Sequence, residues 1–198
     1  MITDVGSAKR DTITKINRIK RKDINWISSH PIAGSEVSGP LNGNENLFVN
    51  KWSVIIKQKK SQNKEMKKIL KFWKLLGSKT VTMNADQHDK IFAITSHLPH
   101  LIAYNLILTA TNFKISNKDN VLKFSAGGLR DFSRIAASNE IMWRDIFFNN
   151  SNNISKAIDL FIKNLNQFKK DINSKNNKSI IKKLIKTKKV RSKIIKLK

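Results

Sequence analysis

"KWSVIIKQKKSQNKEMKKILKFWKLLGSKTVTM", residues 51–83, contains the pattern from which the fold class follows. Its first seven residues, 51–57, are a short apolar run typical of a buried strand. From 63 to 76 the apolar residues recur three and four positions apart, which predicts an amphipathic helix whose buried side holds Met66, Ile69, Leu70, Trp73 and Leu76. Gly77 is expected to end this helix, and 79–83 forms a second strand. A strand, a helix and a strand in this order predict an α/β fold with its ligand site at the carboxyl ends of the strands.

The residues before this stretch extend the α/β pattern. "MITDV" (1–5) is typical of the end of a strand, and "GSAKRDTITKINRIKRK" (6–22) of a turn that leads into a basic helix. "INWISSHP" (24–31) is a short apolar run stopped by proline, so we expect a strand that carries His30 at its carboxyl end.

After Asn84 almost every segment has helical periodicity. We expect one long helix over 85–113, kinked at Pro99, where a missing backbone donor leaves a carbonyl near Thr95 without its usual partner. A second helix should follow the glycine pair at 127–128, and two more should cover about 153–174 and 177–197. The fold class is therefore α/β followed by mainly α, with the change near residue 83.

Composition narrows the class of protein. The chain has 198 residues of which 39% are hydrophobic, so it can bury a core, and it has no cysteine, which fits a reducing cytoplasm. The N-terminus lacks the layout of a signal peptide. Residues 91–113 are long enough to cross a bilayer, but two histidines, a proline and two asparagines favour a buried helix, so no membrane association is expected.

The formal net charge of +25 raises the question of a nucleic-acid partner. About half of the excess lies in residues 156–198, which also keep an apolar helical rhythm. Lysine in that region is best interpreted as the solvated face of helices, and we expect no nucleic-acid partner.

Four blocks of the sequence resemble one known family. They are "TDVGSAK" (3–9), "HPIAGSEVSGP" (30–40), "FWKLLGSKTVTMNADQHDKIFAITSHLPHLIAYNL" (72–106) and "FSAGGLRDFSRIAASNEIMWRDIFFNN" (124–150). In this order they resemble the prephenate and arogenate dehydrogenases, or cyclohexadienyl dehydrogenases, of tyrosine biosynthesis. The resemblance implies that the protein oxidises a cyclohexadienol with NAD or NADP while the ring carboxylate leaves as CO2, and that it works as a cytoplasmic homodimer.

The resemblance also implies a domain organisation. Residues 1–83 would be the C-terminal part of a Rossmann-type dinucleotide-binding domain, and residues 84–198 a helical substrate-binding and dimerisation domain. None of the seven glycines stands in a G-x-G-x-x-G turn, which the family places upstream of "TDVGSAK". We therefore expect a truncated form that keeps the catalytic and substrate residues and has lost most of its affinity for the cofactor.

His30 matches the family's catalytic histidine. The substrate hydroxyl must lose its proton as the carbonyl forms, and a neutral imidazole suits that step near pH 7. Small residues follow it, and Glu36 resembles an acidic residue at the mouth of the family's site. A histidine that only closes the end of a strand is the alternative interpretation.

The remaining histidines lie between residues 88 and 100. The resemblance assigns His100 to substrate binding and leaves His97 to orient or pack. These two share a helix face, as metal ligands would, but only His88 could serve as a third histidine and there is no cysteine, so no metal is predicted. His88 is interpreted as a surface or boundary residue.

Two arginines one helical turn apart suggest carboxylate recognition, because a guanidinium fork makes two parallel hydrogen bonds to a carboxylate. Arg134 matches the family's substrate-binding arginine, and Arg130 and Asp131 resemble residues of a gate or network. Trp143 stands at the family's interface tryptophan position, from which it would reach the neighbouring subunit's site; a plain core tryptophan is the alternative.

The turn after the first strand supplies the cofactor-binding candidates Asp4, Gly6 and Ser7, and Ser7 is also a candidate for contact with the substrate. Two other classes of function stay open at this point. One is a catalytically silent helical dimerisation module, and the other is a basic nucleic-acid-binding protein.

Overall fold

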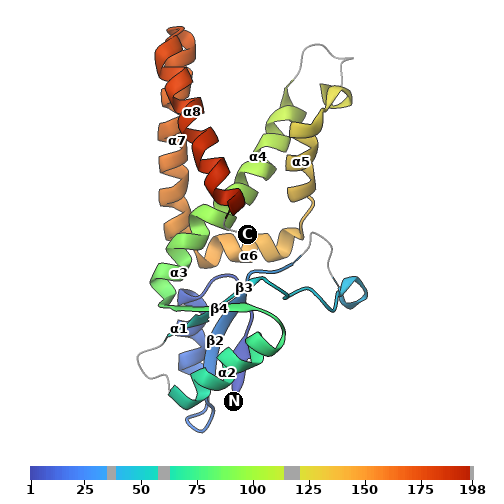
Figure 1. Cartoon of the computed structure of the whole chain (residues 1–198), viewed down its shortest axis with the longest axis vertical. Helices are drawn as coiled ribbons and strands as arrows, with labels where there is room; N and C mark the ends of the chain where they lie inside the picture. The colour runs from blue at the N-terminus through green and yellow to red at the C-terminus, as the bar shows by residue number, and fades with distance from the viewer. Residues whose placement is uncertain (35–38, 58–62, 114–120, 197–198) are drawn as a thin grey trace. The chain divides into compact units, whose positions relative to one another are not determined.

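The computed structural model of the chain describes residues 1–34, 39–57, 63–113 and 121–196. These residues form two compact units, 1–154 and 155–198, called here the first and second unit. The first unit consists of a sheet with helices on both of its faces and further helices after it (Figure 1). The second unit contains most of α7 (Ser151–Asn173) and all of α8 (Asn177–Lys196).

The sheet has four strands in the order β1-β2-β3-β4. They are β1 (Ile2–Asp4), β2 (Trp26–Pro31), β3 (Trp52–Ile56) and β4 (Lys79–Met83), which confirms the four predicted strands. β1 pairs parallel with β2 and β3 pairs parallel with β4, but β2 and β3 are antiparallel, so that His30 lies opposite Val54. The carboxyl ends of β1 and β2 therefore meet at one edge, and those of β3 and β4 at the opposite edge.

Within its described residues the first unit also holds the α-helices α1 (Arg10–Ile19), α2 (Asn63–Leu75), α3 (Ala85–Phe92), α4 (Leu98–Asn112), α5 (Gly127–Ile135) and α6 (Glu140–Asn149). Two short 3-10 segments, Pro40–Asn42 and Val121–Phe124, lie in the connections.

Each face of the sheet is covered by different helices (Figure 1). On one face, α2 buries Ile69 and Trp73 against Ile27 and Ile55 of the sheet. On the other face, Phe92 of α3 packs with Val54 and Ile56, joined by Ile13 of α1 and other partly buried residues. The alternation of residues along β3 therefore feeds two separate apolar clusters, as expected for a sheet buried on both sides.

α2 ends at the predicted glycine. Gly77 has φ +81°, and the Gly77 and Ser78 amides donate to the carbonyls of Lys74 and Trp73 at 3.0 Å each. This pair of bonds is the Schellman arrangement, which uses a left-handed residue that glycine adopts without steric cost. It turns the chain directly into β4.

The long helix predicted over 85–113 is a continuous helical run from Ala85 to Asn112, but its middle is not α-helical. Residues Ala93–His97 form a π-helix between α3 and α4, and Pro99 follows at the start of α4. Because Pro99 has no amide proton, the α-helical bond to Thr95 cannot form, which explains why the irregular turn lies here. By length and composition alone the run could span a membrane, although His88 and Asp89 near its start are buried within the first unit.

The prediction of a single helix after the glycine pair is wrong. The chain forms α5 and then α6, separated near Ser138 and Asn139. The Asn139 side chain accepts the Met142 amide at 2.8 Å and so caps α6. An N-cap satisfies backbone donors that a new helix leaves open, which favours a restart at this residue.

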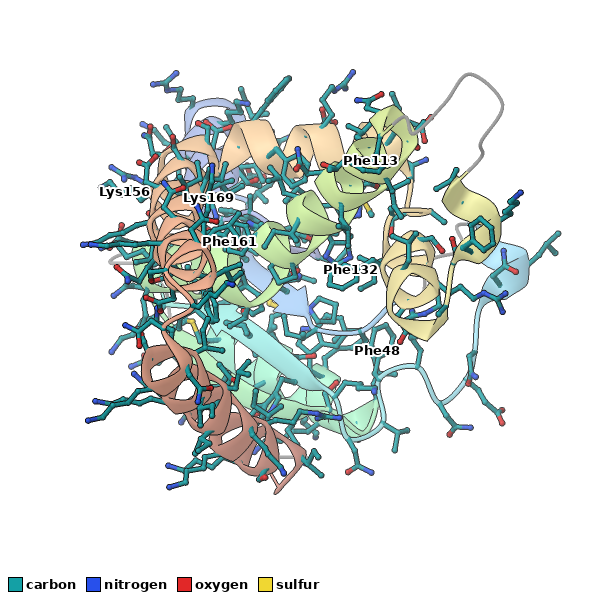
Figure 2. The ribbon with its side chains drawn as sticks, turned by 90° about the horizontal axis from the view of Figure 1, so that it is seen from above. Phe48, Phe113, Phe132, Lys156, Phe161 and Lys169 are labelled. Carbon is teal, nitrogen blue, oxygen red and sulfur yellow. The ribbon has the colours of Figure 1, made fainter. Side chains whose placement is uncertain are left out.

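The two predicted C-terminal helices are confirmed as α7 and α8. Within the second unit, Asp171 accepts hydrogen bonds from Gln167 of its own helix at 3.1 Å and from Ser179 of α8 at 2.6 Å, and it forms an ion pair with Lys183. Lys175, with φ 50°, lies in the turn between the helices. Figure 2 shows the side chains of Lys156 and Lys169 extending outward from α7, consistent with lysine on a solvated face.

Candidate active site

His30 is the penultimate residue of β2, and its side chain is only 9% exposed. Its Nδ1 lies 2.8 Å from Nε2 of His88 in α3. The Phe92 ring lies beside both imidazoles, with ring centroids 5.0 Å from His30 and 4.4 Å from His88. The end of β2 therefore places His30 in contact with the buried His88 side chain and the apolar Phe92 ring.

His88 also contacts the carboxylate of Asp89. Its Nδ1 lies 2.8 Å from Oδ1 of Asp89, and Asp89 also accepts the backbone amides of Lys9 and Arg10 at 2.9 Å each. These amides begin α1, where helix donors have no partner within the helix. The interpretation of His88 as a surface or boundary residue is wrong, because its side chain is completely buried and joins β2 to α3.

Burial controls the charge of the two histidines. Burial, together with the smaller effects of nearby His88 and Lys9, lowers the pKa of His30 to about 2. Burial also lowers the pKa of His88, although Asp89 opposes that change. Both imidazoles are therefore neutral near pH 7, and a neutral imidazole has one nitrogen that can accept a proton.

Lys9 is a buried cation beside this pair, and its role was not predicted from the sequence. Its side chain is fully buried, and its Nζ donates to Asp4 at 2.6 Å and to the Ser29 carbonyl at 2.5 Å. Burial lowers the pKa of Lys9, and Asp4 acts in the opposite direction. In the sequence, Lys9 looked like the first lysine of a basic helix, and only its position after the small residues "GSA" marked it as different.

The predicted cofactor residues lie at the turn between β1 and α1. Asp4 Oδ2 accepts the Gly6 amide at 3.1 Å as well as Lys9, so Asp4 shapes the turn. Its other oxygen, Oδ1, is buried and has no hydrogen-bond partner among the residues that the structure describes. Gly6 and Ser7 border a pocket of about 310 Å³ that Met142 of α6 also lines. A buried acceptor without a partner, at the end of the strand that leads into this turn, fits a bound group that carries an N–H or O–H donor.

A second cluster surrounds the C-terminal histidines. The His100 ring stacks on the Trp143 indole at 3.8 Å between centroids, and its Nδ1 donates to the Ser96 carbonyl at 2.9 Å. The Trp143 side chain is buried within this chain, with 6% exposed. Nowhere in the described ranges do three or more His, Cys, Asp or Glu side chains gather as metal ligands.

Asn150 connects the two clusters. Its side-chain amide donates to the Asp89 carbonyl at 2.8 Å and lies 3.1 Å from Nδ1 of His97. Burial lowers the pKa of His97 to about 4, so His97 is neutral near pH 7 and Nδ1 is its acceptor. His97 Nε2 and Trp143 Nε1 are then buried donors that have no partner among the described residues. The sequence showed Asn150 only as part of an asparagine-rich helix boundary.

The arginines lie on a separate helix. Arg130, Asp131 and Arg134 are exposed residues of α5, which packs beside α4. The ring contacts of His30, by contrast, are with His88 of α3 and Phe92 of the same helix. Glu36 lies outside the described residues.

Comparison with known proteins shows which family has this fold. Residues 1–82 match the family model of the prephenate dehydrogenase nucleotide-binding domain, and residues 84–186 match that of the prephenate dehydrogenase dimerization domain. A prephenate dehydrogenase from A. aeolicus, solved with hydroxyphenyl propionate and NAD+, is 34% identical and superposes with a TM-score of 0.92. That comparison covers 98% of this chain and 67% of the solved chain.

Two curated relatives give the same result. A cyclohexadienyl dehydrogenase from Zymomonas mobilis is 32% identical over 88% of this chain, and a prephenate dehydrogenase from Bacillus subtilis is 30% identical over 85% of it. The matched residues span 59% and 45% of the lengths of these two proteins. Because family models match both regions in order and the same fold recurs in a solved relative, the chain belongs to the prephenate dehydrogenase family.

Proposed function

We propose that the protein oxidises prephenate or arogenate and releases the ring carboxylate as CO2, forming 4-hydroxyphenylpyruvate or tyrosine. The observation that carries this proposal is the buried, neutral imidazole of His30 at the end of β2. The names of the relatives support it, although the chain spans only about half to three-fifths of the lengths of the two curated relatives.

In this proposal His30 accepts a proton. As a hydride leaves the ring carbon that bears the hydroxyl, the hydroxyl oxygen becomes a carbonyl oxygen and gives its proton to the imidazole. When bound, the nicotinamide of NAD or NADP supplies the acceptor for that hydride. Gly6 and Ser7 would lie against the cofactor, and Asp4 Oδ1 would accept one of its hydrogen bonds.

Arg134 is the proposed anchor for a substrate carboxylate. A guanidinium is permanently charged and binds a carboxylate through two parallel hydrogen bonds. Hydroxyphenyl propionate, the ligand of the A. aeolicus relative, is itself a carboxylate with an aromatic ring. His100 and Trp143 would contact the substrate, with Arg130, Asp131 and Glu36 at the entrance.

We also propose that the family's domain boundary applies here, with nucleotide binding in residues 1–83 and substrate binding and dimerisation in 84–198. The match to a dimerization-domain model supports a homodimer. A cytoplasmic location and the choice between NAD and NADP stay predictions.

The test is an assay of the purified protein with prephenate or arogenate and a high concentration of NAD+ or NADP+, followed by the absorbance of the reduced nicotinamide. We expect turnover with at least one of the four combinations.

His30→Gln should lower kcat by about 10²-fold or more and change KM little, because it removes a proton acceptor. Lack of turnover in all four combinations, or full turnover by His30→Gln, would contradict the proposal.

A further inference from the structure

His30, His88 and Asp89 form a buried chain of two hydrogen bonds that the family assignment leaves without a role. Its atoms run from His30 Nδ1 to His88 Nε2 and from His88 Nδ1 to Asp89 Oδ1, with 2.8 Å at each step. We propose that His88 and Asp89 are positioning residues that keep the lone pair of His30 on Nε2 and share the proton that His30 takes from the substrate. This inference rests on the proposed function.

The contacts of Asp89 determine which atom donates in each of the two hydrogen bonds. The backbone amides of Lys9 and Arg10 can only donate, so both oxygens of Asp89 already act as acceptors. The contact at Asp89 Oδ1 therefore needs the proton on His88 Nδ1. Neutral His88 then has its lone pair on Nε2, which makes His30 Nδ1 the donor in the next bond.

The result is a single tautomer of His30. With its proton on Nδ1, neutral His30 must have its lone pair on Nε2, the nitrogen that is not used within the chain of bonds. Without His88 the imidazole could place its proton on either nitrogen, and one of the two tautomers would present a donor where the reaction needs an acceptor.

Asp89 is fixed on several sides. Its carboxylate is held by the start of α1, and its backbone carbonyl accepts the Asn150 side chain at 2.8 Å. Lys9, which is paired with Asp4, is a charged group that also acts on His30. The imidazole of His97 acts on it as well. A positive charge is therefore better tolerated on His88, beside Asp89, than on His30, beside Lys9.

The proton balance of the proposed reaction suits such a closed chain. The hydride takes two electrons from the ring carbon, and the electrons of the broken C–C bond stay in the ring as CO2 leaves. The ring then becomes aromatic with a phenolate oxygen, which takes back the proton that the hydroxyl gave up. The base therefore holds one proton only until the phenolate takes it back, and no proton has to be released to solvent. His30 and His88 together can hold that proton during the reaction.

The tautomer can be measured without substrate or cofactor. Nitrogen-15 NMR of histidine-labelled protein distinguishes protonated from bare ring nitrogens, and with four histidines in the chain His30→Gln identifies the His30 signals. Near pH 7 we expect His30 to carry its proton on Nδ1, and in His88→Phe we expect a mixture of tautomers. A proton on Nε2 in the natural protein, or an unchanged tautomer in His88→Phe, would overturn the inference.

The kinetic arm uses the same variants. His88→Phe should lower kcat by about 10-fold to 100-fold with little change in KM, the size seen for other groups that orient a histidine. Asp89→Asn should act in the same direction, and it serves if circular dichroism shows that His88→Phe does not fold. Lys90→Gln, an exposed change on the same helix, is the matched control and should keep full activity.

The outcomes separate the two proposals. An active natural protein with equally active His88→Phe and Asp89→Asn variants would overturn the role of the pair and leave the proposed function intact. An inactive natural protein would overturn the proposed function, while the NMR result would still decide the tautomer.

Discussion

His30, His88 and His97 are three of the four histidines of the chain, and each is almost completely buried. Each also has a nitrogen or carboxylate partner within hydrogen-bond distance: His88 for His30, Asp89 for His88 and Asn150 for His97. Burial without a full counter-charge disfavours the imidazolium form, so folding holds these side chains neutral.

That neutrality predicts how stability depends on pH. The folded-state pKa is lowered to about 2 for His30 and about 4 for His97, and it is lowered for His88 as well, whereas the ordinary value is 6.5. As the pH falls below 6.5, the unfolded chain binds protons that the folded chain does not, so the free energy of unfolding decreases. The decrease should approach about 1.4 kcal/mol per pH unit for each histidine.

Urea unfolding at a series of pH values checks this prediction. Below about pH 4 His97 should no longer add to this pH dependence, because there His97 is protonated in the folded protein as well. His97→Gln should make the dependence shallower between that value and 6.5. A free energy of unfolding that stays constant as the pH falls from 7 to 5 would contradict the assignment of neutral, buried histidines.

The sequence predicted part of this site. His30 was singled out because a proline and small residues follow a short apolar run, which is a local signal, and its catalytic role is a prediction from the family resemblance. The contacts of Lys9, His88 and Asn150 depend on partners that are distant in sequence: His30 and His88 are 58 positions apart, and Asp89 and Asn150 are 61 positions apart. Local patterns do not report such contacts, so Lys9 looked like part of an ordinary helix, and His88 and Asn150 looked like surface or boundary residues.

At the level of single elements, Gly77 couples the end of α2 to the start of β4. Besides its φ of +81°, a Cβ at this position would lie 3.1 Å from a methyl carbon of Val49 and 3.2 Å from its Cα. Gly77→Ala should therefore destabilise the protein by about 1 to 3 kcal/mol, measured by urea unfolding. Gly127→Ala is the control, because nothing lies within 4 Å of the added carbon and glycine is a poor helix former. Equal stability of the two variants would contradict this account.

Elements were predicted better than their pairing. The pattern of short apolar runs located strands because it reports which side chains are buried. It does not report direction, and the antiparallel pairing of β2 with β3 became visible only in the structure. The break before α6 was missed for a related reason: Asn139 is acceptable within a helix, and only the bond from the Met142 amide shows that it caps a new one.

At the scale of the whole molecule, the second unit exposes many large apolar side chains. Leu160, Leu165 and Ile172 of α7 are more than half exposed, as are Leu184, Ile194 and Ile195 of α8. Large apolar surface on a helical unit is typical of an interface, and a second copy of the chain is the commonest partner. The match to a dimerization-domain model includes most of these residues.

Light scattering after size-exclusion chromatography tests this interpretation. We expect a dimer for the natural protein and a shift toward monomer in Leu165→Glu, because a charge would be buried in an apolar contact. Lys163→Glu is the control, since it places the same side chain on a neighbouring exposed position that already carries a charge. A natural protein that stays monomeric at high concentration would argue against a homodimer.

Because of the π-helix at Ala93–His97, the number of residues between His88 and His97 determines which way these side chains face. Each residue of an α-helix advances by about 100°, so positions nine apart, such as His88 and His97, would face opposite sides of a regular helix. The wider turn takes up one extra residue and cancels part of that angular offset, and His97 and Asp89 both reach Asn150. A one-residue deletion there would restore a regular helix and swing His97 and His100 about a quarter turn away from their partners, even with every functional side chain still present.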